Sequence, residues 1–273
     1  MRLDDLRPTR NVEDRRGGGG GFALGGVGIF VVLIASYFFG IDPTQILGQA
    51  GGPGVQQTAS GEPRSDDAAY EFSRKIVGSA EDVWQPLLHA KGVELTPATL
   101  TVYDGATATS CGTGTAMAGP FYCPEDTHIY LDLSFYNELG ERFGAPGDFA
   151  KAYVVAHEYG HHIQTLLGTM QRREGDTHGA ESNSVRIELQ ADCYAGIWAN
   201  RANARFKILQ AGDVEGGLQA ASAVGDDTIE KRAQGYAVPD SFTHGTSEQR
   251  MRWFKRGLDS GDMDSCDTFA GSL

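Results

Sequence analysis

Residues 147–168 read GDFAKAYVVAHEYGHHIQTLLG, and this stretch decides how the chain folds. It contains no proline, its apolar residues lie on nearly every side of a helical projection, and a glycine follows the last apolar pair. Asp148 is suited to cap the N-terminal end. The stretch therefore predicts a largely buried helix, whose few polar side chains must find partners inside the protein.

Those polar side chains include His157, Glu158 and His161, in the pattern H-E-x-x-H. Residues four apart lie above one another on a helix, so both imidazoles can bind one ion, and imidazole nitrogen binds zinc at about 2.0–2.1 Å. Glu158 lies about 100° round the helix, where a carboxylate can act on a metal-bound water without being a ligand. The pattern predicts a Zn²⁺ site with Glu158 as general acid/base.

Two histidines do not complete a catalytic zinc site, which needs a third protein ligand and a water. Glu188 and Asp192, four apart and with apolar neighbours, share one face of another predicted helix. We expect Glu188 to be the third ligand and Asp192 to accept the second ring N–H of a ligand histidine. His178 is a weaker candidate for the third ligand. Gln164 and Leu167 stand where metzincins have Gly and His, which excludes that class.

His244 and Arg250 are the remaining candidate pair. His244 follows Pro239 in a predicted loop, and Arg250 lies in the first turns of the last predicted helix. Either side chain can stabilise the oxyanion of a tetrahedral intermediate, and we expect a catalytic role for His244 with Arg250 in support. The alternative is that His244 is an exposed loop residue and Arg250 a structural salt-bridge partner.

Residues 22–41 form an apolar segment without a charged residue, long enough to cross a hydrocarbon core of about 30 Å. Five arginines precede it and no Lys or Arg follows before Arg64, so the positive-inside rule places the N-terminus in the cytoplasm and the rest outside the cytoplasmic membrane. A cleaved signal peptide is the alternative. The run is longer than a usual signal core and lacks a clear small-x-small cleavage site, so we expect an uncleaved single-pass anchor.

All four cysteines follow this segment: Cys111, Cys123, Cys193 and Cys266. An even number of cysteines in an oxidising compartment indicates two disulfides. Sequence order makes Cys111–Cys123 and Cys193–Cys266 the simplest pairing among three connectivities. Four buried free thiols are the alternative if the predicted orientation is wrong.

Composition divides the chain into four parts: a cytoplasmic tail (1–21), the transmembrane anchor (22–41), a flexible linker rich in Gly, Pro, Gln, Ser and Thr (42–65), and a folded domain (66–273). The net charge of −13 argues against a nucleic-acid partner, because little positive charge remains to neutralise phosphates. The membrane is a predicted partner through the anchor. The sequence indicates no oligomeric state.

Apolar periodicity in the folded domain predicts mostly helices. They begin near Asp66 and Ser79, span 148–167 and 182–206, follow Asp213, and span 246–258 with a capping box at the start. Alternating β-formers predict strands at 101–103 and 129–133. The predicted fold class is α+β, and Ile129–Leu133 is expected to be an edge strand that pairs with an extended peptide.

Four motifs carry a resemblance that covers nearly the whole chain: NVEDRRG (11–17), GPFYCP (119–124), AHEYGHH (156–162) and ELQADC (188–193). Together they resemble the bacterial neutral zinc metallopeptidase family, the YpfJ-type membrane-anchored proteins. The resemblance implies the following roles: zinc ligands His157, His161 and Glu188, and catalytic acid/base Glu158.

A looser resemblance links Glu188 with Asp192, and His244 with Arg250, to the CAAX-prenyl-protease group of gluzincin-type peptidases. We therefore expect a zincin-like, gluzincin-type domain that uses Zn²⁺ to hydrolyse a peptide or protein substrate outside the cytoplasmic membrane. The alternative is a non-catalytic, zinc-stabilised binding or scaffold domain tethered to the membrane. Glu158 favours the enzyme, because a purely structural zinc site does not need an unligated acid beside it.

Overall fold

The computed structural model describes residues 1–17 and 67–273, so the predicted anchor (22–41) and linker (42–65) lie outside the described residues. Residues 1–16 and 67–273 belong to one compact unit. Among the helices of the described part, none is long and apolar enough to cross a membrane.

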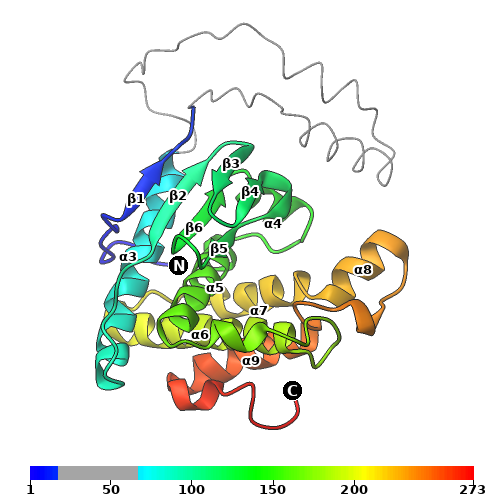
Figure 1. Ribbon diagram of the computed structural model, residues 1–273. Helices are drawn as coiled ribbons and strands as arrows, with labels where there is room; N and C mark the ends of the chain where they lie inside the picture. Colours follow the sequence, from blue (N-terminus) through cyan, green and yellow to red (C-terminus); the bar gives the residue numbers. More distant parts are fainter. Residues whose placement is uncertain (18–66) are drawn as a thin grey trace, which may run out of the picture. The chain divides into compact units, whose positions relative to one another are not determined.

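A four-stranded sheet in the order β1-β2-β6-β5 forms one layer of this unit (Figure 1). Its strands are β1 (Val12–Asp14), β2 (Thr99–Tyr103), β5 (Phe121–Cys123) and β6 (His128–Asp132). β2 runs parallel to both β1 and β6, whereas β5 is antiparallel to β6. A separate hairpin consists of β3 (Ala106–Thr109) and β4 (Gly112–Thr115).

The prediction that Ile129–Leu133 forms an edge strand is wrong. This segment is β6, which pairs with β2 on one side and β5 on the other, so its backbone is occupied on both sides. Its nearly continuous burial fits an inner strand. The edge strand near the helix that carries the histidines is β5.

Most of the remaining residues of the unit form helices. The central one, α5, lies below the sheet in Figure 1 and contacts α3, α4, α6 and α7. They are α3 (Asp67–Ala90), α4 (Phe135–Glu141), α5 (Asp148–Leu166), α6 (Asn183–Phe206), α7 (Asp213–Ala223), α8 (Asp226–Gln234) and α9 (Ser247–Ser260). Short 3₁₀ turns are η1 (Ala116–Ala118), η2 (Met170–Arg173), η3 (Pro239–Ser241) and η4 (Met263–Cys266). The mixed, mostly helical α+β class is confirmed, and so is the capping box between Thr246 and Gln249.

Helix α3 differs from the prediction, because the two helices expected from Asp66 and Ser79 are one continuous helix. Ser79 does not cap a helix start. Its hydroxyl donates to the Ile76 carbonyl at 2.7 Å and accepts from the Trp198 indole at 2.9 Å. A serine that bonds back along its own helix satisfies its polar group without ending the helix.

Residues 1–17 also differ from the expected separate tail, because they pack against the folded domain. β1 pairs with β2 in the register Val12↔Leu100, and Leu6 is buried in the core. Thr9 donates to Glu81 at 2.5 Å. A Cβ on Gly78 would lie 2.8 Å from the Thr9 nitrogen, so glycine permits this segment to pass close to α3.

Both disulfides form with the predicted pairing. Cys111–Cys123 ties the β3–β4 hairpin to β5, and Cys193–Cys266 ties α6 to η4. No free cysteine remains. The full sequence has four cysteines and all four are paired, so the alternative of four free thiols is wrong.

Candidate metal centre

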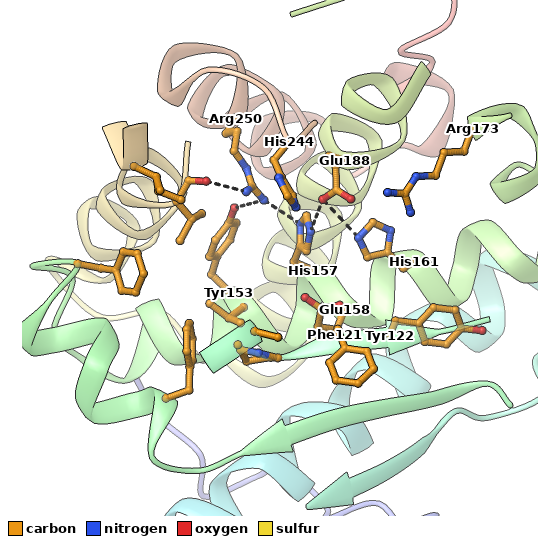
Figure 2. A pocket seen from close by; sticks show the side chains of 18 of the residues that line it. Phe121, Tyr122, Tyr153, His157, Glu158, His161, Arg173, Glu188, His244 and Arg250 are labelled. Atoms are coloured by element: carbon orange, nitrogen blue, oxygen red, sulfur yellow. Dashed lines mark hydrogen bonds and ion pairs between the residues drawn. The ribbon is translucent and has the colours of Figure 1, made fainter. Parts of the chain in front are cut away.

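Three buried side chains converge between α5 and α6: His157, His161 and Glu188 (Figure 2). One ligand atom from each lies within 4.8 Å of the others. The Glu188 Oε2 atom lies 3.2 Å from His157 Nε2 and 3.5 Å from His161 Nε2. Two imidazoles and one carboxylate are a donor set found in catalytic zinc sites, so the residues present fit a zinc ion.

The close approach of α5 and α6 depends on Gly160, which lies inside the H-E-x-x-H pattern. A Cβ at this position would lie 3.0 Å from the Ala191 carbonyl oxygen and 3.2 Å from the Ala191 Cα. Any larger residue would therefore press against the backbone of α6 between Glu188 and Asp192. The small residue Gly160, next to His161 in the sequence, thus permits the helix spacing that brings Glu188 to the histidines.

Asp192 orients His157 from the side opposite the cavity. Its Oδ1 atom lies 2.8 Å from His157 Nδ1 and accepts from the Tyr153 hydroxyl at 2.5 Å. Arg250 donates to both oxygens of Asp192, at 2.8 and 2.9 Å. An Nδ1–H donated to Asp192 leaves the Nε2 lone pair of His157 free for a metal.

The ionised state of Asp192 is strongly favoured. Burial alone would raise the pKa of this carboxyl, but the charge of Arg250 and the contact with His157 outweigh burial and lower the pKa to about 2. Asp192 in turn raises the pKa of His157 to about 10 against the effect of burial, with help from Glu188. Arg250 therefore acts on the metal site through Asp192.

His161 has a partner of its own in Gln164. The His161 Nδ1 atom lies 2.8 Å from Gln164 Oε1, and the Gln164 amide donates to the Ile187 carbonyl at 2.8 Å and to Gln190 at 3.0 Å. Since both amide donors are used, the Gln164 oxygen is directed at His161. Both candidate histidine ligands thus have their Nδ1 positions fixed and their Nε2 atoms toward Glu188.

Glu158 lies beside the three ligands and lines the same cavity (Figure 2). It is buried, and burial raises the pKa of its carboxyl although His157 and His161 lower it. The group that can hold an ion contains no fourth His, Cys, Asp or Glu among the described residues. A three-ligand site leaves a coordination position for water, which distinguishes catalytic from structural zinc sites.

His244 reaches this cavity from the loop before α9. Its Nδ1 atom lies 3.2 Å from Asp226 Oδ1, while Asp226 Oδ2 accepts backbone N–H groups from Thr243, His244 and Gly245 at 2.7–3.0 Å. The His244 side chain is 52% exposed, as the alternative of an exposed loop residue expected. Partial loss of solvation lowers the pKa of its ring, but the hydrogen bond with Asp226 and the charge of Glu188 together outweigh this loss and raise the pKa. Asp226 thereby holds both the loop and the ring.

His178 and His162 lie outside the metal group. His178, the weaker candidate for third ligand, is exposed and lies 2.9 Å from the Thr177 hydroxyl. His162 is buried on another side of α5, where it contacts the Thr96 carbonyl at 2.6 Å and the Tyr122 hydroxyl at 3.1 Å. Burial lowers the pKa of His162, so this ring is a neutral structural residue.

Sequence reasoning missed three residues of this arrangement: Tyr153, Gln164 and Asp226. Tyr153 lies one helical turn before His157, on the same face, and this spacing was the available signal. Gln164 lies three residues after His161 and was considered only as a mismatch to metzincins. Asp226 had no signal, because its pairing with His244 spans 18 residues and depends on how α8 and the loop meet.

Comparisons with known proteins also point to a zinc-binding protein. A family model described as "Putative neutral zinc metallopeptidase" matches residues 1–269. The chain is 44% identical over 292 residues to "Uncharacterized protein YpfJ" of Escherichia coli (strain K12), covering 100% of both chains. It is 42% identical over 204 residues to "Uncharacterized protein Rv2575" of Mycobacterium tuberculosis, covering 71% of this chain and 68% of that protein. No solved structure matches the chain.

Proposed function

This chain belongs to the neutral zinc metallopeptidase family, and from that premise we propose that it is a zinc-dependent endopeptidase. The observation that carries the proposal is the buried, three-ligand group of His157, His161 and Glu188 with Glu158 beside it. The proposed ligands are those three residues, and the proposed acid/base is Glu158. A zincin-like, gluzincin-type fold is part of the same proposal.

The chemistry that zinc supplies when bound is a water with its pKa lowered to about 7. With zinc held by His157, His161 and Glu188, the Glu158 carboxylate would take up a proton as general base and pass it to the leaving amine as general acid. The His244 ring, held at Nδ1 by Asp226, presents its other nitrogen to the cavity and donates to the oxyanion of the tetrahedral intermediate. Arg250 keeps Asp192 ionised, and Asp192 keeps His157 in the ligating tautomer.

A peptide substrate fits the walls of the cavity, which has a volume of about 400 Å³. Large apolar side chains form much of the lining: Phe135, Phe143, Val154, Val224 and Ile229. They suit an apolar side chain of the substrate next to the scissile bond. Phe121 and Tyr122 of the edge strand β5 also line the cavity, so an extended peptide can pair with β5 rather than with the predicted segment 129–133.

Action outside the cytoplasmic membrane, with attachment through residues 22–41, is part of the proposal. The support is the pair of disulfides in the domain, because such bonds persist in oxidising compartments. The proposed catalytic domain is residues 66–273, and residues 1–16 belong to the same compact unit.

The experiment is a cleavage assay on the full-length, zinc-loaded protein with a mixed peptide library and product detection by mass spectrometry. Glu158→Gln should retain zinc and lose about 10²–10⁴-fold in turnover, because the general acid/base is gone. Glu125→Gln, an exposed acid on the loop after β5, is the control and should match the wild type.

Two results would contradict the proposal. Full activity in Glu158→Gln would remove Glu158 from the mechanism. The absence of any cleavage by the zinc-loaded wild type would favour the alternative, a zinc-stabilised binding or scaffold domain.

A further inference from the structure

Two arginines line the metal cavity, and their surroundings differ. Arg250 is 4% exposed and makes two hydrogen bonds to Asp192, while its third nitrogen donates to the Val224 carbonyl at 3.2 Å. Its charge is therefore matched inside the protein. All three nitrogens of Arg250 thus already donate within the protein.

Arg173 is the second arginine and lies at the end of η2. Its Nε atom donates to the hydroxyl of the buried Ser184 at 3.2 Å, which fixes the base of the guanidinium. No ion pair of the described residues involves Arg173. Its two terminal nitrogens remain for a partner, and a guanidinium binds a carboxylate through two parallel hydrogen bonds.

The position of Arg173 relates this cation to the metal. Figure 2 shows its guanidinium directed toward the ligands from the His161 side, with Arg250 and Tyr153 on the other side. Val224, an apolar lining residue, lies on the Arg250 side because its carbonyl accepts from Arg250. Arg173, which has no ion pair among the described residues, and the ion-paired Arg250 thus lie on opposite sides of the three candidate ligands.

We propose that Arg173 is a specificity-determining residue that binds a carboxylate of the peptide substrate, on the His161 side of the scissile bond. The substrate class is a peptide that carries a carboxylate close to the cleaved bond. That carboxylate is either the C-terminal α-carboxylate or an acidic side chain. The inference rests on the proposed peptidase function and adds to it the chemistry by which substrates are selected.

The test compares matched peptides on the full-length, zinc-loaded protein. One pair differs only in a free or amidated C-terminus, and a second set exchanges Asp or Glu for Asn or Gln within three residues of the cleaved bond. Arg173→Gln should lower kcat/KM for the carboxylate peptides by about 10- to 100-fold, as expected for loss of a charge-assisted hydrogen bond, and leave the neutral peptides within about twofold. Arg173→Lys should recover part of the loss.

Arg172→Gln is the matched control. Its guanidinium lies 3.6 Å from the Phe269 ring centroid, and Arg172 does not line the cavity. The same peptides should also bind the inactive Glu158→Gln protein, and Arg173→Gln in that background should weaken only the carboxylate peptides in calorimetry. The responding pair of peptides identifies the source of the carboxylate.

Equal losses for charged and neutral peptides, or no loss, would overturn the role of Arg173 while cleavage itself upholds the proposed function. If the wild type cleaves and binds none of the peptides, the proposed function fails and the selection of carboxylates fails with it.

A second inference follows independently from the N-terminal segment. β1 is a strand of the domain sheet, and Arg7 pairs with Glu81 at 2.8 Å and Asp82 at 2.8 Å on α3. Arg16 lies 3.5 Å from Asp67, so the chain before residue 18 and the chain after residue 66 meet. A single crossing by residues 22–41 would separate these partners across the bilayer.

We infer that residues 1–17 and the domain lie on the same side of any membrane, in contrast to the topology expected from the positive-inside rule. The arginines counted by that rule include Arg7 and Arg16, which have carboxylate partners in the domain. These two arginines therefore stabilise the folded domain through ion pairs, and their presence before the apolar segment does not require a cytoplasmic N-terminus.

The test uses single engineered thiols in the full chain, where all four native cysteines are paired. Arg10→Cys and Glu125→Cys both replace exposed residues. A membrane-impermeant maleimide should label both variants in intact cells, or both only after lysis. Labelling of one in intact cells and of the other only after lysis would overturn the inference.

Discussion

At the scale of single residues, Asp192 connects the proposed metal ligands to the rest of the site. It is fully buried and accepts hydrogen bonds from Tyr153, Arg250 and His157. Without its negative charge, Arg250 would be a buried cation with no carboxylate, and His157 would lose the acceptor that fixes its tautomer. Both effects weaken the site without touching a ligand atom.

Asp192→Asn should therefore weaken zinc binding by about 10- to 100-fold, the range seen when the partner of a ligand histidine is removed. Competition with a chelator measures this affinity. Asp240→Asn changes an exposed acid in η3 and should leave the affinity unchanged. Equal affinities in the two variants would show that Asp192 does not orient His157.

The same carboxylate predicts a pH dependence of stability in the zinc-free protein. Its pKa falls from the ordinary value of 3.8 to about 2 in the folded state, so its contribution is complete above about pH 4 and is lost as the pH falls from 4 to 2. The contribution is about 2 kcal/mol. Urea unfolding should show that the free energy of unfolding falls less between pH 6 and pH 2.5 in Asp192→Asn than in the wild type. An equal loss of unfolding free energy in the two proteins would contradict the contribution of Asp192.

At the scale of elements, the contact between α5 and α6 sets the distance between the histidines and Glu188. Gly160→Ala should destabilise the fold by about 1–3 kcal/mol and weaken zinc binding, because its Cβ would lie 3.0 Å from the Ala191 carbonyl. Gly216→Ala on α7 is the control, since a Cβ there meets nothing within 4 Å. Its stability should be unchanged or higher by up to about 1 kcal/mol.

Thermal unfolding and chelator competition on both variants check this prediction. If Gly160→Ala and Gly216→Ala behave alike, the helices can separate enough to accept a methyl group and Gly160 does not set their spacing.

The elements also show which features the sequence could predict. Helix α5 and the pairing of Glu188 with its histidines were predictable, because apolar residues surround H-E-x-x-H and because residues four apart share a helix face. Strand β1 could not be predicted. Its three residues, Val12–Asp14, have polar neighbours in the sequence and form a strand only because they pair with β2. The edge position of β5 was not predictable either, because strand order depends on pairings distant in the sequence.

Within the site, local contacts were easier to predict than contacts between loops. Asp192 was identified because Glu188 places it on the same helix face. Asp226 was not, because its pairing with His244 joins the start of α8 to the loop before α9. A side chain that acts through tertiary contact leaves no periodic signal.

At the scale of the whole molecule, the N-terminal segment completes the domain sheet. A chain that begins at residue 67 would leave one side of β2 unpaired and remove Leu6 from the core. Its Tm should fall by at least about 5 °C, since 1 kcal/mol corresponds to about 2–4 °C in a domain of this size, and the open strand edge should promote association.

Thermal unfolding and light scattering of the truncated and full chains measure both effects. A synthetic peptide of residues 1–17 should restore part of the Tm when added to the truncated chain. An unchanged Tm in a monodisperse truncated chain would mean that β1 adds nothing to the stability of the domain.

The Cys193–Cys266 bond has a consequence for how the protein comes apart. It closes a covalent ring with a sequence separation of 73, and His244 and Arg250 lie within that ring. Asp192 adjoins the ring, whereas His157 lies outside it. In the unfolded chain this bond keeps His244 and Arg250 within one closed loop of reduced conformational entropy, whereas it does not restrict His157 and His161. Refolding must therefore chiefly bring the helix that carries His157 and His161 back to this closed loop.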